Sequence, residues 1–341
     1  MPNNSMKILF LMTLISGVLI SLCANSWMGA WMGLEINLLS FIPLLSSSKN
    51  LFSTEASLKY FLIQAISSST FLFLIMMKIN IQEMFYLMKF NNWNTLITIP
   101  ILMKIASAPF HWWLPSVMEG LSWMNCFIIL SIQKVAPLMF ISYLITNNFF
   151  IQIIITISAI MGAIGGLNQI SLRKILSFSS INHIGWMLTT MIMGSNFWMT
   201  YFIIYTVNII PIIFMVNKMN LSFIPQTFNS FNNKKIIKFI LFSSLLSLGG
   251  LPPFIGFFPK WIIIQIMIQN LMILTSMTLI MSSLLTLYYY LRIIYTTLMI
   301  TNSEMTWMAI YSNNNLGKST FLFLFILIFG LSICTLILTI Y

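Results

Sequence analysis

Apolar runs of membrane-spanning length recur along almost the whole chain of 341 residues. A helix needs about 20 apolar residues, at about 1.5 Å each, to cross roughly 30 Å of hydrocarbon. Eleven runs reach that length, at residues 6–24, 27–46, 56–78, 95–118, 122–146, 149–171, 173–193, 196–217, 236–268, 271–299 and 318–340. Short polar segments connect them and leave no room for a soluble domain. The sequence therefore predicts an all-α polytopic membrane protein in which residues 1–341 form a single membrane domain.

The scarcity of charge supports the same class of protein. Hydrophobic residues make up 59% of the chain and charged residues 6%, whereas about 25% is usual in soluble domains. This composition excludes a disordered chain and a disulfide-stabilised secreted scaffold. The net charge of +11 could suggest nucleic-acid binding, but the densest basic cluster, Lys234, Lys235 and Lys238, is small. We therefore expect lipid and other membrane proteins as partners, and no nucleic acid.

The sequence contains no pattern for binding a cofactor or a metal. Cys23, Cys126 and Cys334 lie far apart inside apolar runs, which argues against a disulfide, a metal site or a redox pair. No segment outside the spans could form a nucleotide site, a flavin site or a phosphate-binding loop. The N-terminus lacks a convincing cleavage site, so its apolar run is expected to be the first membrane helix. We expect no cofactor or metal to be bound by this chain.

Basic residues gather in alternate connections between the predicted spans. If the N-terminus lies inside, Lys78 and Lys89 fall on the outer side, where Glu83 partly offsets them. Ten basic residues then fall on the inner side, namely Lys7, Lys49, Lys59, Arg173, Lys174, Lys218, Lys234, Lys235, Lys238 and Lys318. Loops on the inner side of a membrane carry an excess of Lys and Arg. The bias supports eleven spans with the N-terminus inside and the C-terminus outside.

One motif occurs twice, at a distance of 144 residues. Residues 109–115 and 253–259 share the pattern of Pro, Phe, four residues and Pro. The first span starts near residue 6, and the sixth starts about 144 residues later, near residue 150. Residues 1–146 and 149–299 are therefore expected to form two five-helix repeats, with residues 318–341 as an extra C-terminal helix. An odd number of helices inverts the second repeat, and inverted repeats with interrupted helices are typical of transporters.

Four charged residues lie deep inside the predicted spans. They are Glu35, Lys104, Lys134 and Lys260. A charge at the centre of a membrane helix costs about 2.5–3.5 kcal/mol on insertion scales, so these residues must be paired, hydrated or able to lose their charge. Snorkelling to the headgroups suits Lys59 and Lys78 near helix ends but does not suit Lys134. A structural ion pair between Glu35 and Lys104 remains an alternative to a functional role.

Prolines interrupt two spans close to buried lysines. They are Pro109 in the fourth predicted span and Pro252, Pro253 and Pro259 in the ninth. Because proline cannot donate to the carbonyl four residues back, Pro109 and Pro259 are expected to free the carbonyls of Ile105 and Ile255. In hydrocarbon such carbonyls are tolerated only where protein or water satisfies them. A titratable amine beside such a break is what a hydrated proton path needs.

Two histidines are candidate proton relays, because imidazole titrates near neutral pH. His111 lies within the first break and His183 in the middle of the seventh span. A hydrogen-bonded core histidine is the alternative for both. Several other features have structural explanations: an exposed helix end for Glu119, an i,i+4 pair for Glu55 and Lys59, and close helix packing for Gly162, Gly165 and Gly166.

Several segments resemble the antiporter-like membrane subunits of respiratory complex I. They are residues 31–37, 53–61, 108–113, 165–169, 172–175, 248–253 and 259–261. The resemblance covers nearly the whole chain and implies roles in proton translocation. Glu35 falls on the family's buried glutamate, Lys104 on the lysine of the first broken helix, Lys134 on the central lysine and Lys260 on the residue of the second broken helix. Bacterial members have fourteen helices, so eleven resembles the animal form that lacks the first three.

The resemblance implies a subunit of the proton-translocating NADH:ubiquinone oxidoreductase with no redox site of its own. NADH, FMN, iron–sulfur clusters and ubiquinone would then be held by other subunits. Partners would be other membrane subunits of complex I, including neighbouring antiporter-like subunits. The implied location is the mitochondrial inner membrane, with the N-terminus on the matrix side and the C-terminus on the intermembrane-space side.

The expected mechanism depends on switching the charge of a buried amine. Burial favours the neutral form of a lysine, and a nearby carboxylate favours the charged form. Movement of Glu35 relative to Lys104 would switch that amine between holding and releasing a proton. Lys134 would pass the proton along the membrane midplane, and Lys260 would load or eject it. Two alternatives remain: a free-standing cation/proton antiporter, and a structural subunit that anchors its neighbours.

Overall fold

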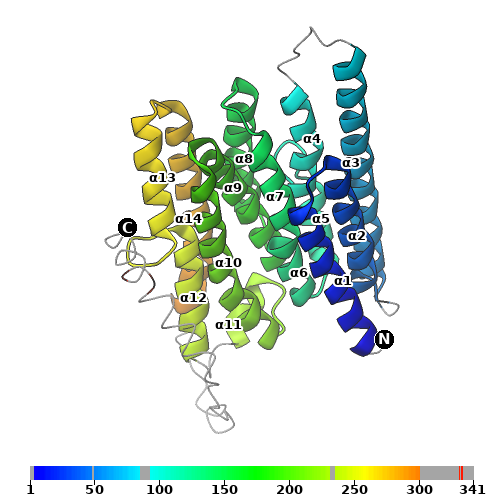
Figure 1. Ribbon diagram of the computed structural model, residues 1–341. Helices are drawn as coiled ribbons and strands as arrows, with labels where there is room; N and C mark the ends of the chain where they lie inside the picture. Colours follow the sequence, from blue (N-terminus) through cyan, green and yellow to red (C-terminus); the bar gives the residue numbers. More distant parts are fainter. Residues whose placement is uncertain are drawn as a thin grey trace. The chain divides into compact units, whose positions relative to one another are not determined.

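The structure, a computed structural model, describes residues 4–47, 50–84, 93–230, 235–299, 330 and 332 (Figure 1). The described residues form helices and turns, with one isolated antiparallel bridge between Ser171 and Phe223. The helices are α1 (Asn4–Cys23), α2 (Trp27–Leu45), α3 (Leu51–Met84), α4 (Trp93–Ile105), α5 (Trp113–Gly120), α6 (Trp123–Leu130), α7 (Ile132–Leu144), α8 (Phe149–Leu167), α9 (Leu172–Met193), α10 (Ser195–Lys218), α11 (Ile224–Ser230), α12 (Lys235–Gly249), α13 (Phe257–Gln269) and α14 (Ile273–Met299). The all-α prediction is confirmed for this part of the chain.

Seven helical stretches of the described residues are long and apolar enough to cross a membrane. They are Ser5–Cys23, Trp27–Leu45, Leu51–Asn80, Trp123–Leu144, Phe149–Leu167, Phe197–Lys218 and Ile273–Tyr295. The predicted span 173–193 is the single helix α9, and the spans 95–118 and 236–268 are each divided into two shorter helices. The predicted span 318–340 lies outside the described residues. The structure therefore supports a polytopic membrane protein, and the count of eleven spans stays a prediction.

The fifth predicted span contains a break that the sequence did not predict. Residues 122–146 are divided between α6 and α7 at Ser131, which has φ −116° and ψ −81°. The Ser131 hydroxyl donates to the carbonyl of Phe127 over 2.6 Å. Pro137 within α7 cannot donate to the carbonyl of Gln133, so the helix also lacks a hydrogen bond just after the break. The connection after α10 contains the short helix α11, which apolar runs did not predict either.

Contacts group the chain into two compact units, Met1–Ser158 and Ala159–Tyr341. In the first unit α2 packs against α1 and α3, while α4 packs against α3 and α7. Glycines allow α1 and α2 to approach closely: a Cβ on Gly33 would lie 2.6 Å from the nitrogen of Ser21. Leu34, which follows Gly33, is buried, and Glu35 is half-buried on the same helix.

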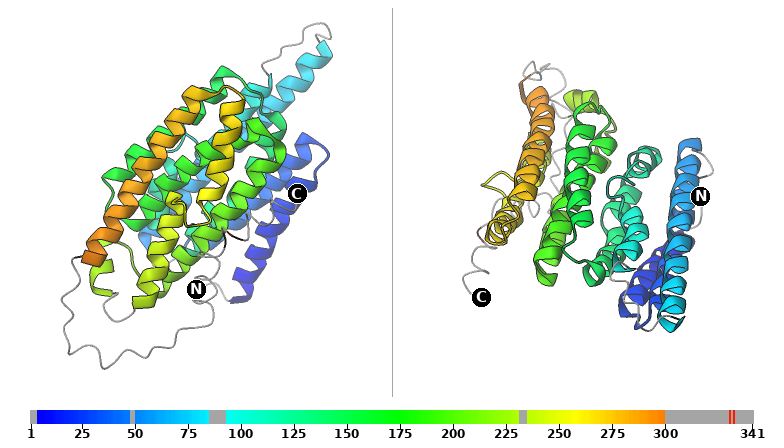
Figure 2. Two further views of the ribbon diagram at one scale, coloured as in Figure 1. Left: turned by 90° about the vertical axis from the view of Figure 1, so that its left-hand side faces the viewer. Right: turned by 90° about the horizontal axis from the view of Figure 1, so that it is seen from above.

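In the second unit α9 packs against α10, α13 and α14, and α14 lies along α12 and α13 (Figure 2). Glycines on α8 meet these helices closely. A Cβ on Gly162 would lie 2.5 Å from the nitrogen of Asn182 on α9, and one on Gly165 would meet the Phe178 ring. A Cβ on Gly166 would lie 2.7 Å from the Tyr289 ring of α14. The predicted role of these three glycines in helix packing is confirmed.

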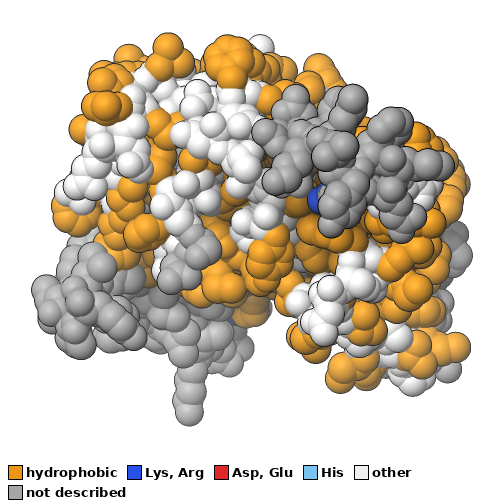
Figure 3. All heavy atoms as spheres, turned by 45° about the horizontal axis from the view of Figure 1, so that its top comes forward, with side chains coloured by type: hydrophobic (Ala, Val, Ile, Leu, Met, Phe, Trp, Pro, Cys, Tyr) orange, Lys and Arg blue, Asp and Glu red, His pale blue; other side chains and the backbone are white. Residues whose placement is uncertain are grey.

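The surface is as apolar as the composition requires. Figure 3 shows a face dominated by hydrophobic side chains, with almost no charged side chain visible. Large hydrophobic residues are exposed along several helices, among them Met12 on α1, Leu62 on α3, Ile203 on α10 and Leu284 on α14. Apolar surface of this extent marks a protein that lies in lipid or against other membrane proteins.

Candidate functional site

The break in the fourth predicted span is a hydrogen-bonded turn that ends α4. Ala106 has a φ of 65°, and the N–H of Ser107 donates to the carbonyl of Leu102 over 3.1 Å. The N–H of Ala106 donates to the carbonyl of Met103 over 3.2 Å. These two bonds form a Schellman motif, a common way for a helix to end. The helix therefore ends before the chain reaches Pro109.

The break in the ninth predicted span ends α12 in the same way. Gly250 has a φ of 85°, and the N–H of Leu251 donates to the carbonyl of Leu246 over 3.3 Å. The N–H of Gly250 donates to the carbonyl of Ser247 over 3.1 Å. Each of these residues lies 144 positions after its counterpart in the first break. The two breaks share their backbone hydrogen bonds as well as their sequence motif.

The prolines act differently from the prediction. Pro109 lies in the segment between α4 and α5 and is not the residue that ends a helix. Pro259 is the third residue of α13, where an N–H has no partner within the helix in any case. It does not free the carbonyl of Ile255, which accepts a hydrogen bond from the N–H of Phe258 over 3.3 Å. The turn after α12 contains the other two prolines, Pro252 and Pro253.

Side chains from other helices donate hydrogen bonds to the carbonyls at the end of α4. Trp113 Nε1 of α5 donates to the carbonyl of Met103 over 3.1 Å. Gln64 Nε2 of α3 donates to the carbonyl of Lys104 over 3.4 Å. An unsatisfied backbone group in hydrocarbon costs several kcal/mol, so these two donors stabilise the end of α4.

Lys104 and Lys134 line one cavity in the first unit. Lys104 lies at the end of α4 and is 8% exposed, and Lys134 lies on α7, just after the break at Ser131, and is 3% exposed. Tyr60 and Gln64 of α3 line the cavity as well. The volume of this cavity that the centre of a water molecule can occupy is about 20 Å³. About 10–15 Å³ of such volume is enough for one ordered water. The structure thus brings two of the predicted site residues to one cavity that can hold water.

A side-chain hydrogen bond joins the helices that carry Glu35 and Lys134. Gln133 Nε2 of α7 donates to Asn37 Oδ1 of α2 over 2.9 Å, and both residues line the same cavity. Sequence reasoning did not single out this pair. The available signal was a polar residue in an apolar run, one position from Lys134 in one case and two from Glu35 in the other.

Glu35 is half-buried on α2. In the described part of the chain the two residues form no ion pair within 4 Å, and the one ion pair found there joins Glu55 to Lys59. The structural alternative, a direct salt bridge between Glu35 and Lys104, is therefore not observed. The carboxylate and the amine therefore do not form a direct ion pair in this structure.

Lys260 holds the end of α12 in the second unit. Its Nζ donates to the carbonyl of Leu248 over 3.2 Å and to that of Gly249 over 2.9 Å. The same nitrogen lies 5.8 Å from the ring centroid of Trp186, and the side chain is only 7% exposed. A cation is favoured at a helix C-terminus, where open carbonyls carry partial negative charge. The amine of Lys260 therefore donates to the end of α12, whereas the neutral side chains of Gln64 and Trp113 donate to the end of α4.

His183 belongs to a polar cluster in the second unit. Its Nδ1 shares a hydrogen bond of 2.8 Å with the hydroxyl of Tyr201, and its ring centroid lies 5.0 Å from that of Tyr205. These three residues line a second cavity together with Asn208 and Ser247. The structure agrees with a hydrogen-bonded core histidine and also places it beside a cavity, so the proton-relay hypothesis stays open.

His111 has a different environment in the first unit. It is 2% exposed within the segment between α4 and α5, and its ring centroid lies 4.8 Å from that of Trp112. It is not among the residues that line the cavity of Lys104 and Lys134. The described geometry therefore gives less support to a relay role for His111 than for His183.

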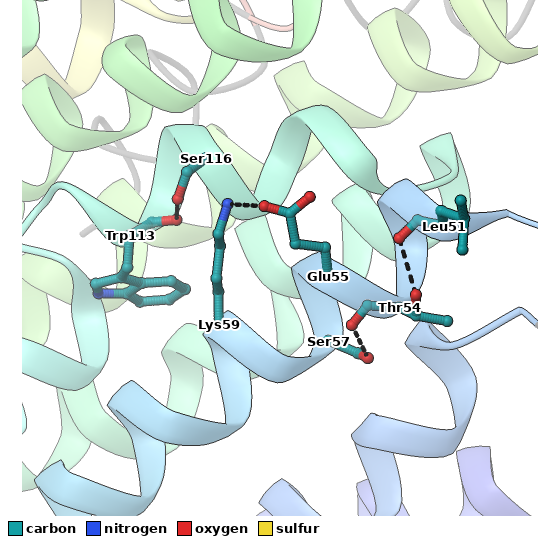
Figure 4. A network of polar contacts seen from close by, with 7 residues as sticks. All are labelled: Leu51, Thr54, Glu55, Ser57, Lys59, Trp113 and Ser116. Carbon is teal, nitrogen blue, oxygen red and sulfur yellow. Dashed lines mark hydrogen bonds and ion pairs between the residues drawn. The ribbon is translucent and has the colours of Figure 1, made fainter.

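Charged residues near the surface have the structural roles that were expected. Lys59 Nζ lies 2.5 Å from Glu55 Oε1, one turn away on α3, and Figure 4 shows this pair beside Trp113 and Ser116 of α5. Glu119 is exposed at the end of α5. In the residues that the structure describes, no group of three or more His, Cys, Asp or Glu could hold a metal ion.

Comparison of the sequence with known proteins shows the family to which the chain belongs. Residues 24–286 match the model described as NADH:quinone oxidoreductase/Mrp antiporter, TM. The chain belongs to this family. It is 49% identical over 340 residues to NADH-ubiquinone oxidoreductase chain 2 of Aedes aegypti, with 99% of each chain covered. It is 47% identical over 334 residues to the protein of that name from Anopheles gambiae, with 96% of this chain and 97% of the relative covered.

A solved structure shows the same fold at lower identity. A chain of respiratory complex I from Thermus thermophilus matches with a TM-score of 0.79 and 18% identity, covering 87% of this chain and 71% of that one. The resemblance to antiporter-like subunits is confirmed, and the insect relatives narrow it to the mitochondrial NADH dehydrogenase subunit 2 type. The broken helices and buried lysines described above belong to a chain of this family.

Proposed function

We propose that the chain is a proton-translocating membrane subunit of NADH:ubiquinone oxidoreductase, respiratory complex I. The observation that carries the proposal is the cavity of the first unit, in which Lys104 and Lys134 meet beside neutral polar side chains. Two amines this deeply buried are costly unless they can exchange their charge with water or with one another. Near full-length similarity to the insect chain 2 proteins supports the assignment to this complex.

In the first unit, the position of Glu35 decides which form of Lys104 is favoured. A carboxylate brought close to the amine favours the ammonium form. When α2 moves the carboxylate away, burial favours loss of the proton from Lys104. A water in the cavity then carries the proton to Lys134, which lines the same cavity. The hydrogen bond between Asn37 and Gln133 couples α2 to α7, so a movement of the helix that bears Glu35 also reaches Lys134.

In the second unit, Lys260 loads or ejects the proton. Two carbonyls of α12 accept hydrogen bonds from its Nζ, and a charged ammonium makes such bonds more strongly than a neutral amine. Release of the proton therefore weakens the attachment of α13 to the end of α12. His183 and His111 are candidate relays, with His183 the better placed because it lines a cavity.

The redox chemistry that drives these movements belongs to other subunits. NADH, FMN, iron–sulfur clusters and ubiquinone are expected there, and the partners of this chain are other membrane subunits of the complex. We place the chain in the mitochondrial inner membrane with its N-terminus in the matrix and its C-terminus in the intermembrane space. The two five-helix stretches, 1–146 and 149–299, are proposed to be inverted repeats.

Replacement of Lys104 by Met tests the function. Methionine keeps the length and apolar stem of the side chain but carries no proton. In the assembled complex we expect fewer protons pumped per NADH oxidised, measured with reconstituted vesicles. The matched control is Lys59→Met, which removes an exposed lysine that lies outside the cavity and should leave the ratio unchanged. An unchanged ratio in both variants contradicts the proposal.

Two other functions make different predictions. A free-standing cation/proton antiporter would purify alone and exchange ions without an electron donor. A structural anchor would tolerate neutralisation of the buried lysines without loss of pumping. Proteins that co-purify in mild detergent decide the first comparison, because a large assembly that oxidises NADH excludes an antiporter acting alone.

A further inference from the structure

The two cavities occupy equivalent places in the two units. Tyr60, Gln64 and Lys104 line the first cavity. The residues 144 positions later, Ile204, Asn208 and Leu248, line the second. Each cavity is therefore lined in part by the end of a broken helix, α4 or α12, and by the preceding long helix, α3 or α10. Among these three pairs of equivalent residues, Gln64 and Asn208 are the pair that carries the same polar group, a side-chain carboxamide.

The two carboxamides differ in what they bind. Gln64 donates to the carbonyl of Lys104. At the second break the equivalent carbonyl, of Leu248, already accepts from the Nζ of Lys260. Asn208 is left beside the cavity with its Oδ1 buried and without a hydrogen-bond partner among the described residues, and the whole residue is 2% exposed. A buried carboxamide oxygen with no partner is destabilising, so a donor is needed there.

We propose that Asn208 is a further residue of the proton path, and that its Oδ1 holds an ordered water in the second cavity. The volume of that cavity, measured at water centres, is about 10 Å³, at the lower limit of about 10–15 Å³ for one water. The cavity has the polar lining residues that an internal water requires: Asn208, Ser247, and the pair formed by His183 and Tyr201.

This water links two groups that the proposed function leaves separate. The carbonyl of Leu248 accepts a hydrogen bond from Lys260 Nζ, and Leu248 itself is one of the residues that line the cavity. When the Nζ–H bond of Lys260 breaks, the proton passes to the water oxygen. A second proton of that water then moves to the imidazole of His183, and the water is regenerated. One positive charge is carried throughout, and the chain needs no further reactant.

The inference depends on the proposed function, and three variants separate the two. Asn208→Leu has a similar size but no acceptor, and Lys260→Met removes the amine. Asn208→Gln keeps the carboxamide, on the longer side chain that is found at the equivalent position 64. We expect Asn208→Leu to lower protons pumped per NADH as far as Lys260→Met does, with the same amount of assembled complex. Asn208→Gln should retain most of the pumping, which a merely structural role for the side chain does not require.

If the Asn208→Leu variant fails to assemble, the water can still be looked for directly in the unmodified complex. In a structure of the unmodified complex that resolves ordered waters, a water should lie about 2.7–3.2 Å from Asn208 Oδ1. A dry cavity, or normal pumping by Asn208→Leu while Lys260→Met is impaired, overturns this inference and leaves the proposed function standing. Normal pumping by Lys260→Met contradicts the role proposed for Lys260 itself.

Discussion

At the scale of single residues, Gly250 and Lys260 depend on one another. The φ of 85° at Gly250 ends α12, and this conformation costs glycine little. A Cβ at that position would lie 2.9 Å from Lys260 Cδ and 3.0 Å from its Nζ. The absence of a side chain thus permits both the turn and the approach of the amine to the carbonyls of Leu248 and Gly249.

Replacement of Gly250 by Ala tests this dependence. The left-handed conformation alone costs an L-residue about 1–2 kcal/mol, and the added methyl group displaces the Lys260 side chain. We expect a lower thermal stability of the assembled complex and a lower proton-to-electron ratio. The control is the neighbouring Gly249→Ala, where a Cβ makes only ordinary contacts from 3.5 Å. Equal behaviour of the two variants would contradict the account.

The sequence could predict which residues carry charge at depth, but not what satisfies the breaks. Lys104, Lys134 and Lys260 were identified because charge is rare inside apolar runs. The donors Gln64 and Trp113 reach the end of α4 from other helices, across 40 and 10 residues of chain. Such pairings depend on how helices pack, and apolar periodicity carries no information about them.

At the scale of helices, length and hydropathy predicted most elements, and local backbone events account for the differences. The break at Ser131 lies in an apolar run without Gly or Pro at that point, so nothing in the composition marked it. The two predicted breaks were located correctly, but the turns at Ala106 and Gly250, rather than Pro109 and Pro259, end the helices.

Replacement of Gly162 by Ala tests the packing of α8 on α9. A Cβ there would lie 2.5 Å from the nitrogen of Asn182, so the helices must separate. Overpacking of this kind typically costs about 1–3 kcal/mol. We expect a lower midpoint of thermal unfolding for the assembled complex. Ile164→Ala, on the exposed side of the same helix, should leave the midpoint unchanged, and a similar loss in both variants would argue against a specific contact.

At the scale of the whole molecule, the distribution of basic residues predicts how the chain crosses the membrane. Ten basic residues against two favour an N-terminus in the matrix. In a Cys23→Ser background, Lys7→Cys should react with a membrane-impermeant maleimide only from the matrix side. Thr146→Cys, at the outer end of the fifth predicted span, should react only from the intermembrane space. Labelling of both positions from one side would contradict the predicted topology.

The central claim is that buried lysines in the first unit carry protons in series. It is tested most directly by the number of protons pumped per NADH oxidised, measured for Lys134→Met, Lys104→Met and the double variant in reconstituted complexes with equal assembly. If both amines belong to one path, each single variant lowers the ratio and the double variant lowers it no further. A ratio equal to that of the unmodified complex in the double variant would contradict the account.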